Sequence, residues 1–354
     1  MHNDDLIIGV SINNVTGITG KAYDLSDLVR AAVEAEAMGF DAVWVHDAMM
    51  GRRTTAAYCP VTTLAAIAGR TSRIRLCTGI LTPQVRNPVQ LANQWATLYE
   101  LSDQRAIMGV GMGAGTPTLI KREFEGLAVL KHGTDLNPAE LYAKRGKVFD
   151  ECLDVMRQLW ANDKISYQGE FFRFNEITLG HARPQSMPPV LIASGIYFPT
   201  EPGGPVHHGW KPSIAGHWLP GNLNRVIDYG DGWITVHLSP GEYAENWRKI
   251  AKLGAERQPG KGYMPAFNCF MNVNDDPRLG WEGVRDHLED FHGPPIRDDV
   301  VDRWAVAGPP DRIAARLNEY IDAGVRIFQI VIGSPDQFGQ MRRIAEQVLP
   351  LIKR

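Results

Sequence analysis

The sequence predicts an α/β protein of the (β/α)₈ barrel class, the TIM barrel, with a long insertion after the fifth strand. Eight short runs rich in Val and Ile alternate with segments of helical periodicity, the order expected of parallel strands joined by helices. The runs are almost continuously apolar, as in strands that helices cover on both faces. A chain of 354 residues suits one such barrel, and no shift in composition divides it, so we expect a single domain over residues 1–354. The competing architecture, a doubly wound open sheet, is less usual with eight parallel strands in one unit.

The first half of the chain supplies four strands and four helices. The first helix has Asp24 or Ser26 at its N-cap and Gly39 at its end, while Pro60 and Pro88 begin the next two helices. We expect strands over 6–12, 40–47, 74–80 and 105–113, and helices over 24–39, 60–70, 88–102 and 139–161.

The second half contains the remaining strands and two irregular stretches. We expect strands over 190–194, 232–237, 266–273 and 326–333, and helices over 241–256, 310–323 and 337–352. A polar excursion covers 162–189. The segment 196–224 is rich in Gly, Pro, His and Trp, and loops of that length usually carry function, so we interpret it as an active-site lid or loop.

Composition excludes several classes of protein. The net charge is −3 without a basic block, which argues against nucleic-acid binding. The four cysteines form no C-x-x-C pair, and the histidines of the long loop have no acidic or Cys partners at ligand spacing, so we expect neither a metal nor a disulfide framework. No run approaches the roughly 18 apolar residues of a membrane helix, and the N-terminus is acidic where a signal peptide is basic. We therefore expect a cytoplasmic protein.

The stretch "GVGMGA" over 109–114 fits the dinucleotide fingerprint G-x-G-x-x-A, but its context differs. The fingerprint opens a helix in the first βαβ unit, whereas this stretch ends a fourth strand. We interpret its glycines as residues that clear space for a ligand.

In a barrel, the C-terminal ends of the strands line the active site. Small residues at several of these ends suit a large flat ligand lying close to the backbone, and Ser194-Gly195 could present amides to a phosphate. The positions nominated in this way are His46, Asp47, Thr78, Gly79, Ile80, Met112, Gly113, Ser194, Gly195 and His237.

Several segments resemble one known family, the bacterial-luciferase-like flavin oxidoreductases, in its order along nearly the whole chain. They are "GFDAVWVHD", "LAAIAGRTSRIRLCTGILTPQVRNPVQLANQWATLYELSDQRAIMGVGMG", "PPVLIAS", "YGDGWI" and "GPPDRIAARLNEYIDAGV". The resemblance implies a barrel that binds FMN or the deazaflavin coenzyme F-420 at its C-terminal mouth. It also implies a non-prolyl cis peptide bond at Gly79-Ile80. Cofactor contacts are then expected from Asp47, Thr78, Gly79, Ile80, Met112, Gly113, Ser194 and Gly195.

The chain departs from the family at the proton-transfer positions. Deazaflavin sugar-phosphate dehydrogenases of this family use a His and a Glu where this chain has Ala48 and Ala114, and "ITVHLS" lacks their Lys for sugar phosphate. His46 and Asp47 are the remaining catalytic candidates. The substrate contacts we expect come from Trp44, Trp210 and His237 in a dry, Trp-rich mouth.

The reading we favour is a two-component monooxygenase that uses reduced FMN, O₂ and a small organic substrate. No NAD-binding module is evident, so a separate flavin reductase is the expected partner, together with a homodimer or higher homo-oligomer. The alternatives are hydride transfer with coenzyme F-420, without O₂, and a flavin-binding protein without catalysis. We also expect Gly79→Val to abolish flavin binding with the barrel intact, because its side chain would intrude on the ring.

Overall fold

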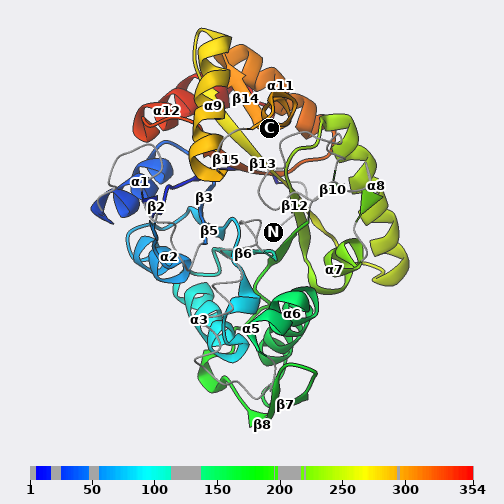
Figure 1. Ribbon diagram of the computed structural model, residues 1–354. Helices are drawn as coiled ribbons and strands as arrows, with labels where there is room; N and C mark the ends of the chain where they lie inside the picture. Colours follow the sequence, from blue (N-terminus) through cyan, green and yellow to red (C-terminus); the bar gives the residue numbers. More distant parts are fainter. Residues whose placement is uncertain are drawn as a thin grey trace.

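The structure is a computed structural model that describes residues 5–16, 25–47, 56–112, 137–194, 196–197, 217–218, 221–292 and 296–353. Eight parallel strands form a closed barrel at its centre, and helices surround them (Figure 1). Each strand pairs with the next along the chain, and the last strand pairs with the first. The barrel strands are β1 (Ile7–Ser11), β3 (Ala42–Val45), β5 (Arg75–Thr78), β6 (Ala106–Val110), β9 (Val190–Ala193), β12 (Gly232–Thr235), β13 (Met264–Val273) and β15 (Ile327–Ile332). The predicted fold class is therefore confirmed.

The helices begin where the sequence provides caps. The Asn87 side chain accepts hydrogen bonds from the amides of Val89 and Gln90, and Ser239 forms a capping box with Glu242. The α-helices are α1 (Leu25–Ala37), α2 (Pro60–Ala68), α3 (Pro88–Leu101), α5 (Pro138–Ala143), α6 (Arg145–Ala161), α7 (Asn222–Tyr229), α8 (Pro240–Arg257), α9 (Pro277–His292), α10 (Asp298–Trp304), α11 (Pro310–Asp322) and α12 (Gln337–Arg343). Shorter helical turns cover Pro83–Val85, Gly180–Ala182, Ile344–Val348 and Leu349–Leu351.

Five stretches differ from the sequence prediction. The helix expected over 337–352 is α-helical only to Arg343, where α12 ends, and continues as shorter helical turns. The helix expected over 139–161 is broken at Lys144 into α5 and α6, and the polar excursion contains a hairpin of β7 (Ile165–Gln168) and β8 (Arg173–Ile177). The segment 196–224 already includes the start of α7, and α9, α10 and β14 (Ala305–Gly308) follow β13 where no element was expected. Two further strand pairs join β2 (Val15–Thr16) to β4 (Ala56–Ala57) and β10 (Ile196–Tyr197) to β11 (His217–Trp218).

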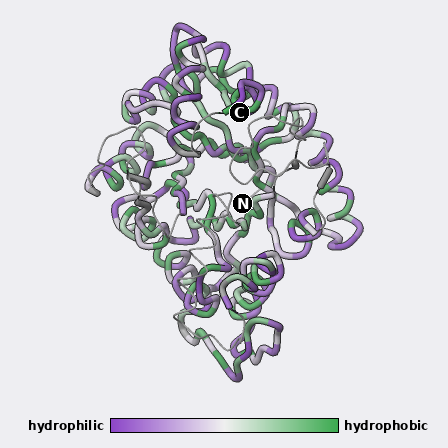
Figure 2. The backbone as a smooth tube through the Cα atoms, viewed as in Figure 1, coloured by the Kyte–Doolittle hydropathy of each residue, from purple (hydrophilic) through white to green (hydrophobic). Residues whose placement is uncertain are grey.

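Apolar side chains pack on both sides of the barrel wall. Figure 2 shows the hydrophobic residues of the central strands in green along the backbone. Alternate residues of each strand point inward, and the others pack against the helices, which explains why the strands are continuously apolar. The inner cluster consists of Ile7, Ala42, Trp44, Cys77, Ile107, Leu191, Ile234, Met264, Ala266 and Ile327. Trp44 is fully buried among them, and a Cβ on Gly9 would collide with its indole. The space inside the barrel is therefore shaped around this tryptophan.

The upper half of β13 leaves β12 and pairs with β14. Residues 264–267 of β13 pair with β12, whereas residues 270–273 pair with β14. Helix α9 packs on β13 and β14 at this end, which is the C-terminal mouth of the barrel. The mouth thus has an additional wall on this side.

Candidate active site at the C-terminal mouth

The turn after β5 is fixed by both neighbouring strands. The Gly79 amide donates to the Val45 carbonyl (2.8 Å), and the buried Thr78 hydroxyl donates to the Gly109 carbonyl (2.8 Å). The peptide bond between Gly79 and Ile80 is cis, as the resemblance predicted. Three of the predicted site residues therefore lie together at the end of one strand.

The Ile80 side chain turns back over the barrel interior. A Cβ on Gly111 would collide with Ile80 and would stand 3.2 Å from the Cβ of Ala193, so Ile80 occupies the space that the missing side chain leaves. Ile80 and Ala193 are half-buried and pack on the inner cluster. Together they form an apolar surface across β5, β6 and β9, the kind of surface on which a flat ring system can lie.

His46 lies directly after β3, and its Nδ1 is 2.9 Å from the Gly79 carbonyl oxygen. Because a carbonyl only accepts, Nδ1 carries the proton and Nε2 has the lone pair of the neutral ring. Burial lowers the pKa of His46, and the hydrogen bond to Gly79 opposes that effect only in part. The imidazole is therefore neutral near pH 7 and can accept a proton.

The Gly79 carbonyl has a second donor, the buried Gln329 on β15. Gln329 Nε2 lies 3.3 Å from that oxygen and donates to Ser11 Oγ at 3.1 Å. A Cβ on Gly79 would collide with this amide. The expectation for Gly79→Val needs correction for this reason: the valine would displace Gln329 before it reached any ligand.

Asp47 is held by an ion pair and a main-chain hydrogen bond. Its two oxygens accept from the two terminal nitrogens of Arg86, each at 2.7 Å, and Oδ2 also accepts from the Thr82 amide at 2.9 Å. The Asp47 side chain is 2% exposed and that of Arg86 is 16% exposed. The sequence nominated Asp47 for catalysis and cofactor binding, whereas the contacts in the structure are those of a residue that fastens the turn after β5.

The other nominated cofactor residues have different surroundings. Ser194 is 7% exposed, and its hydroxyl has no hydrogen-bond partner among the described residues. Met112 faces α6, because its sulfur would stand 3.6 Å from a Cβ on Gly146. Gly113, Gly195 and the predicted substrate residue Trp210 lie outside the described residues.

Trp44 and His237, which the sequence nominated for substrate contact, are both buried. Trp44 is part of the barrel core below the mouth. His237 follows β12 with φ of +62°, its ring lies 3.6 Å from that of Trp304, and its carbonyl accepts from Arg303. Trp44 thus lies inside the barrel, whereas His237 lies beyond the end of β12, against Trp304.

Sequence reasoning missed an aromatic wall on the α9 side of the mouth. The ring of Phe270 lies 5.4 Å from that of Trp304 and 5.7 Å from that of His287 on α9. Phe270 and Trp304 belong to an apolar cluster, which His287 borders. The cluster consists of Phe270, Val284, Leu288, Ile296, Val301, Trp304 and Val331. The alternation of β13 places Phe270 on the inward side, and this signal could have identified it.

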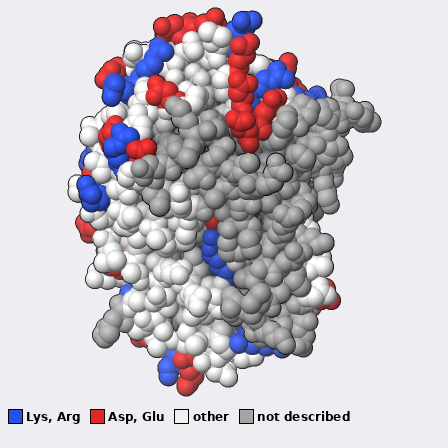
Figure 3. Space-filling model, turned by 60° about the vertical axis from the view of Figure 1, so that its left-hand side comes forward, with Lys and Arg blue, Asp and Glu red and all other residues white. Residues whose placement is uncertain are grey.

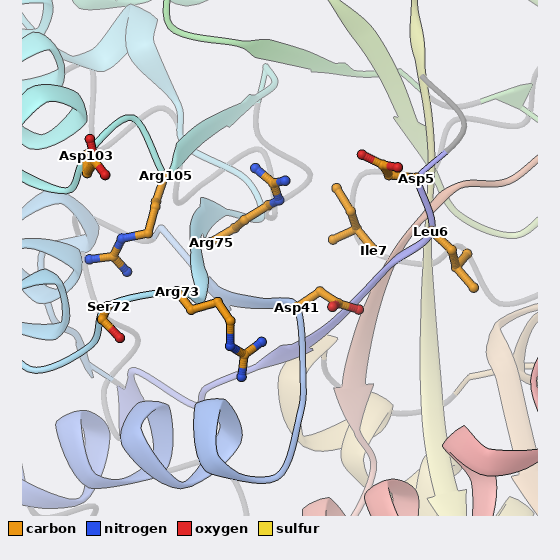
Figure 4. Close-up of a pocket in the computed structure, with 9 residues that line it drawn as sticks. All are labelled: Asp5, Leu6, Ile7, Asp41, Ser72, Arg73, Arg75, Asp103 and Arg105. Carbon is orange, nitrogen blue, oxygen red and sulfur yellow. The ribbon is translucent and has the colours of Figure 1, made fainter. Parts of the chain in front are cut away.

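A cavity of about 690 Å³ opens at the opposite, N-terminal end of the barrel (Figure 4). Three arginines and three aspartates line it, and Figure 4 shows Arg75 and Asp5 on opposite sides. The Arg105 guanidinium is engaged by Thr71 Oγ1 and by the carbonyls of Ser102, Ile74, Ala68 and Thr71. Barrel enzymes carry their chemistry at the other end, so we assign this cavity no catalytic role.

Charge and metal ligands add little to the site. On the face shown in Figure 3, the acidic and basic side chains of the described residues are interspersed, and these residues form no continuous basic surface. Within the same residues, no group of His, Cys, Asp and Glu could hold a metal ion. The described helices include none that is long and apolar enough to cross a membrane.

The closed barrel and the mouth built from small, apolar and neutral polar residues define the class, a barrel enzyme with its ligand site at the C-terminal strand ends. The chain belongs to the luciferase-like monooxygenase family, whose model matches residues 7–326. It is thus a luciferase-like oxidoreductase by family.

Similar proteins include both F-420-dependent dehydrogenases and a monooxygenase. An F-420-dependent glucose-6-phosphate dehydrogenase of Amycolatopsis mediterranei is 27% identical over 92% of this chain and 94% of its own length. A solved F-420-dependent secondary alcohol dehydrogenase, in complex with an F-420–acetone adduct, has a TM-score of 0.74 at 19% identity and covers 99% of this chain and 100% of its own. A monooxygenase from Streptomyces bottropensis has a TM-score of 0.72 at 20% identity, covering 98% and 99%. The two structures are similar in fold.

Proposed function

We propose that this protein is an oxidoreductase that uses coenzyme F-420 for hydride transfer to or from a small organic substrate. The observation that carries the proposal is the full-length similarity to an F-420-dependent dehydrogenase. This was the alternative in the sequence analysis, and the relatives support it better than reduced FMN with O₂.

Two observations support the binding of a flavin-like ring at the mouth. The surface of Ile80 and Ala193 is apolar and close to the backbone, and the buried Ser194 hydroxyl has no partner among the described residues. We expect Gly79, Ile80 and Ala193 to hold the ring, with Ser194 as a polar contact. When bound, coenzyme F-420 supplies a two-electron hydride donor or acceptor.

His46 is the side chain we propose for proton transfer. Oxidation of an alcohol releases one hydride from carbon and one proton from oxygen, so it needs a base at the hydroxyl. The neutral ring of His46 has its lone pair on Nε2, and the Gly79 carbonyl fixes its orientation through Nδ1. This role would replace the missing His and Glu of the sugar-phosphate dehydrogenases.

The second candidate function is the two-component monooxygenase, which the description of the matching family favours. It requires reduced FMN and a separate flavin reductase as partner. A homodimer or higher homo-oligomer is compatible with either function.

Titration of the purified full chain with coenzyme F-420, FMN and reduced FMN distinguishes the candidates. We expect F-420 to bind at least about tenfold more tightly than either form of FMN, a difference of about 1.4 kcal/mol. Fluorescence and absorbance would be followed with and without O₂. Preferential binding of reduced FMN with a long-lived peroxyflavin absorbance would establish the monooxygenase, and binding without any substrate turnover would support a non-catalytic flavin protein.

A further inference from the structure

The α9 side of the mouth contains a buried polar atom without a partner. His287 is 7% exposed, and its Nδ1 has no hydrogen-bond partner in the described part of the chain. A buried polar nitrogen without a partner is unfavourable, and a ligand that forms a hydrogen bond with it would remove that cost. The ring of His287 lies 5.7 Å from that of Phe270, whose side chain is on the inward side of β13, so His287 borders the mouth.

The surroundings of His287 are apolar and aromatic. Phe270 lies against its ring, Trp304 lies against Phe270, and Val331 on β15 belongs to the same cluster. Such a surface favours an uncharged, partly apolar molecule, because a charged group would lose its hydration without gaining a counter-ion.

The nearby cations are already paired. Arg285 contacts Glu289 and Asp298, Arg297 contacts Asp299, and Arg303 contacts Glu242. Recognition of a phosphate needs cations or several amides directed at it. The described residues of this wall offer no cation that lacks a carboxylate, which disfavours a sugar phosphate here.

We infer that the site takes an uncharged alcohol or ketone, whose apolar part packs on Phe270, Trp304 and Val331 and whose oxygen contacts Nδ1 of His287. The inference rests on the proposed function, because an alcohol and its ketone are a pair that hydride transfer interconverts. A neutral imidazole suits both members of the pair, since the tautomer with the proton on Nδ1 donates to the oxygen of either the ketone or the alcohol, and the hydroxyl proton of the alcohol remains available to His46. His287 is thereby a substrate-binding residue.

Calorimetric binding to the cofactor-loaded full chain tests this inference. The probes are acetophenone, 1-phenylethanol and glucose-6-phosphate. We expect the two uncharged probes to bind at least about tenfold more tightly than the phosphate. Tighter binding of glucose-6-phosphate, or no binding of either uncharged probe, would overturn the inference.

Variants separate a contact with substrate from a structural role. His287→Leu should weaken acetophenone binding at least about fivefold, about 1 kcal/mol, whereas His287→Asn keeps a polar atom near Nδ1 and should restore most of the affinity. Trp95→Phe is the matched control, because the Trp95 indole nitrogen is also buried without a partner but lies in the outer core. Equal affinity in His287→Leu and the unchanged protein would refute the contact.

Two further measurements test the inference if His287→Leu does not fold or if the proposed cofactor does not bind. If His287→Leu fails to fold, Val331→Phe fills the same wall without removing a polar group and should also block acetophenone. Unchanged binding in Val331→Phe would then overturn the inference. Affinity for F-420 is measured separately on each protein, so a failure of the proposed cofactor is distinguished from a failure of the proposed substrate.

Discussion

Polar side chains at the mouth divide into those that hold the backbone and those that lack a partner. Thr78, Asp47 and Gln329 each have their hydrogen bonds within the protein. The buried polar atoms of Ser194 and His287 have none in the described residues. Residues of the first kind contribute to stability, and those of the second kind lower it in the absence of a ligand.

Ser194→Ala should therefore separate stability from cofactor binding. Removal of a buried hydroxyl without a partner should raise the free energy of unfolding of the ligand-free protein by about 1 kcal/mol. The same change should weaken F-420 binding severalfold, because the ring or its side chain loses a polar contact. Urea unfolding and a fluorescence titration measure the two quantities. A destabilised variant with unchanged affinity would show that Ser194 has a structural role only.

Asp47→Ala should destabilise the protein by about 3 kcal/mol, because it leaves the half-buried Arg86 and the Thr82 amide without their acceptor. Asp27→Ala is the control, since the pair of Asp27 and Arg30 lies on the surface and should contribute little. Thermal or urea unfolding measures both variants. Asp47→Ala with full stability and no catalysis would instead support the catalytic role that the sequence nominated.

His287 should make stability depend on pH. Burial, aided by nearby His46, lowers the pKa of His287 to about 4 from an ordinary value of 6.5. Between these values the unfolded chain binds a proton that the folded protein does not. The free energy of unfolding therefore decreases by up to about 3 kcal/mol as the pH is lowered from above 6.5 to about 4. Urea unfolding at about pH 7 and about pH 4.5 should show a smaller loss in His287→Leu. Equal losses in both proteins would contradict the prediction.

The sequence predicted which residues lie at the mouth better than it predicted the contacts that these residues make. The sequence placed His46, Thr78, Gly79 and Ile80 at the mouth because each ends an apolar run. It could not reveal that Gln329, 250 residues further along the chain, contacts Gly79. Closure of the barrel brings β15 beside β1, and this long-range contact has no local signal.

Among the elements, the hairpin of β7 and β8 is fastened to α6 at its turn by the Glu151 carboxylate. Glu151 on α6 accepts hydrogen bonds from the amides of Glu170, Phe171 and Phe172 in the hairpin turn. Much of the hairpin itself is exposed to solvent. The hairpin therefore depends on α6 more than α6 depends on the hairpin.

Glu151→Ala should loosen this hairpin selectively. The three amides lose their acceptor, so residues 165–177 should exchange amide hydrogens at least about tenfold faster, about 1.4 kcal/mol of local stability. The barrel strands should keep their protection. Hydrogen exchange followed by mass spectrometry measures both regions. Faster exchange throughout the barrel would indicate that Glu151 stabilises the whole molecule instead.

There is a physical reason why helix α9 was not predicted from the sequence. Helix α9 contains Gly280 and Gly283, which lower helix propensity. Both are needed for close packing: a Cβ on Gly280 would stand 3.0 Å from the Gly308 amide, and one on Gly283 would collide with Asn272. Tertiary packing thus stabilises a helix that local propensity disfavours, and this helix carries His287. The eight barrel strands were predictable because burial on both faces gives each a continuous apolar run.

At the scale of the whole molecule, the residues that stabilise the fold and those available to bind a ligand lie at opposite ends of the barrel. At the N-terminal end, half-buried polar groups such as the Arg105 guanidinium have their partners within the protein. At the C-terminal mouth, Ser194 and His287 have polar atoms without partners in the described residues. This arrangement is expected of a barrel in which one end maintains the fold and the other holds the ligand.

Arg105→Met tests this separation. The substitution keeps an apolar stem but leaves the carbonyls of Ser102, Thr71, Ile74 and Ala68 without their donor, so the free energy of unfolding should fall by at least about 2 kcal/mol. Affinity for F-420, measured well below the unfolding transition, should stay within about twofold because no mouth residue changes its contacts. Arg73→Met is the matched control, since Arg73 is exposed and donates to one carbonyl, that of Glu36, and it should alter neither quantity much. A folded Arg105→Met protein with strongly weakened F-420 binding would show that the two ends are energetically coupled, and the assignment of the N-terminal end to stability alone would then be wrong.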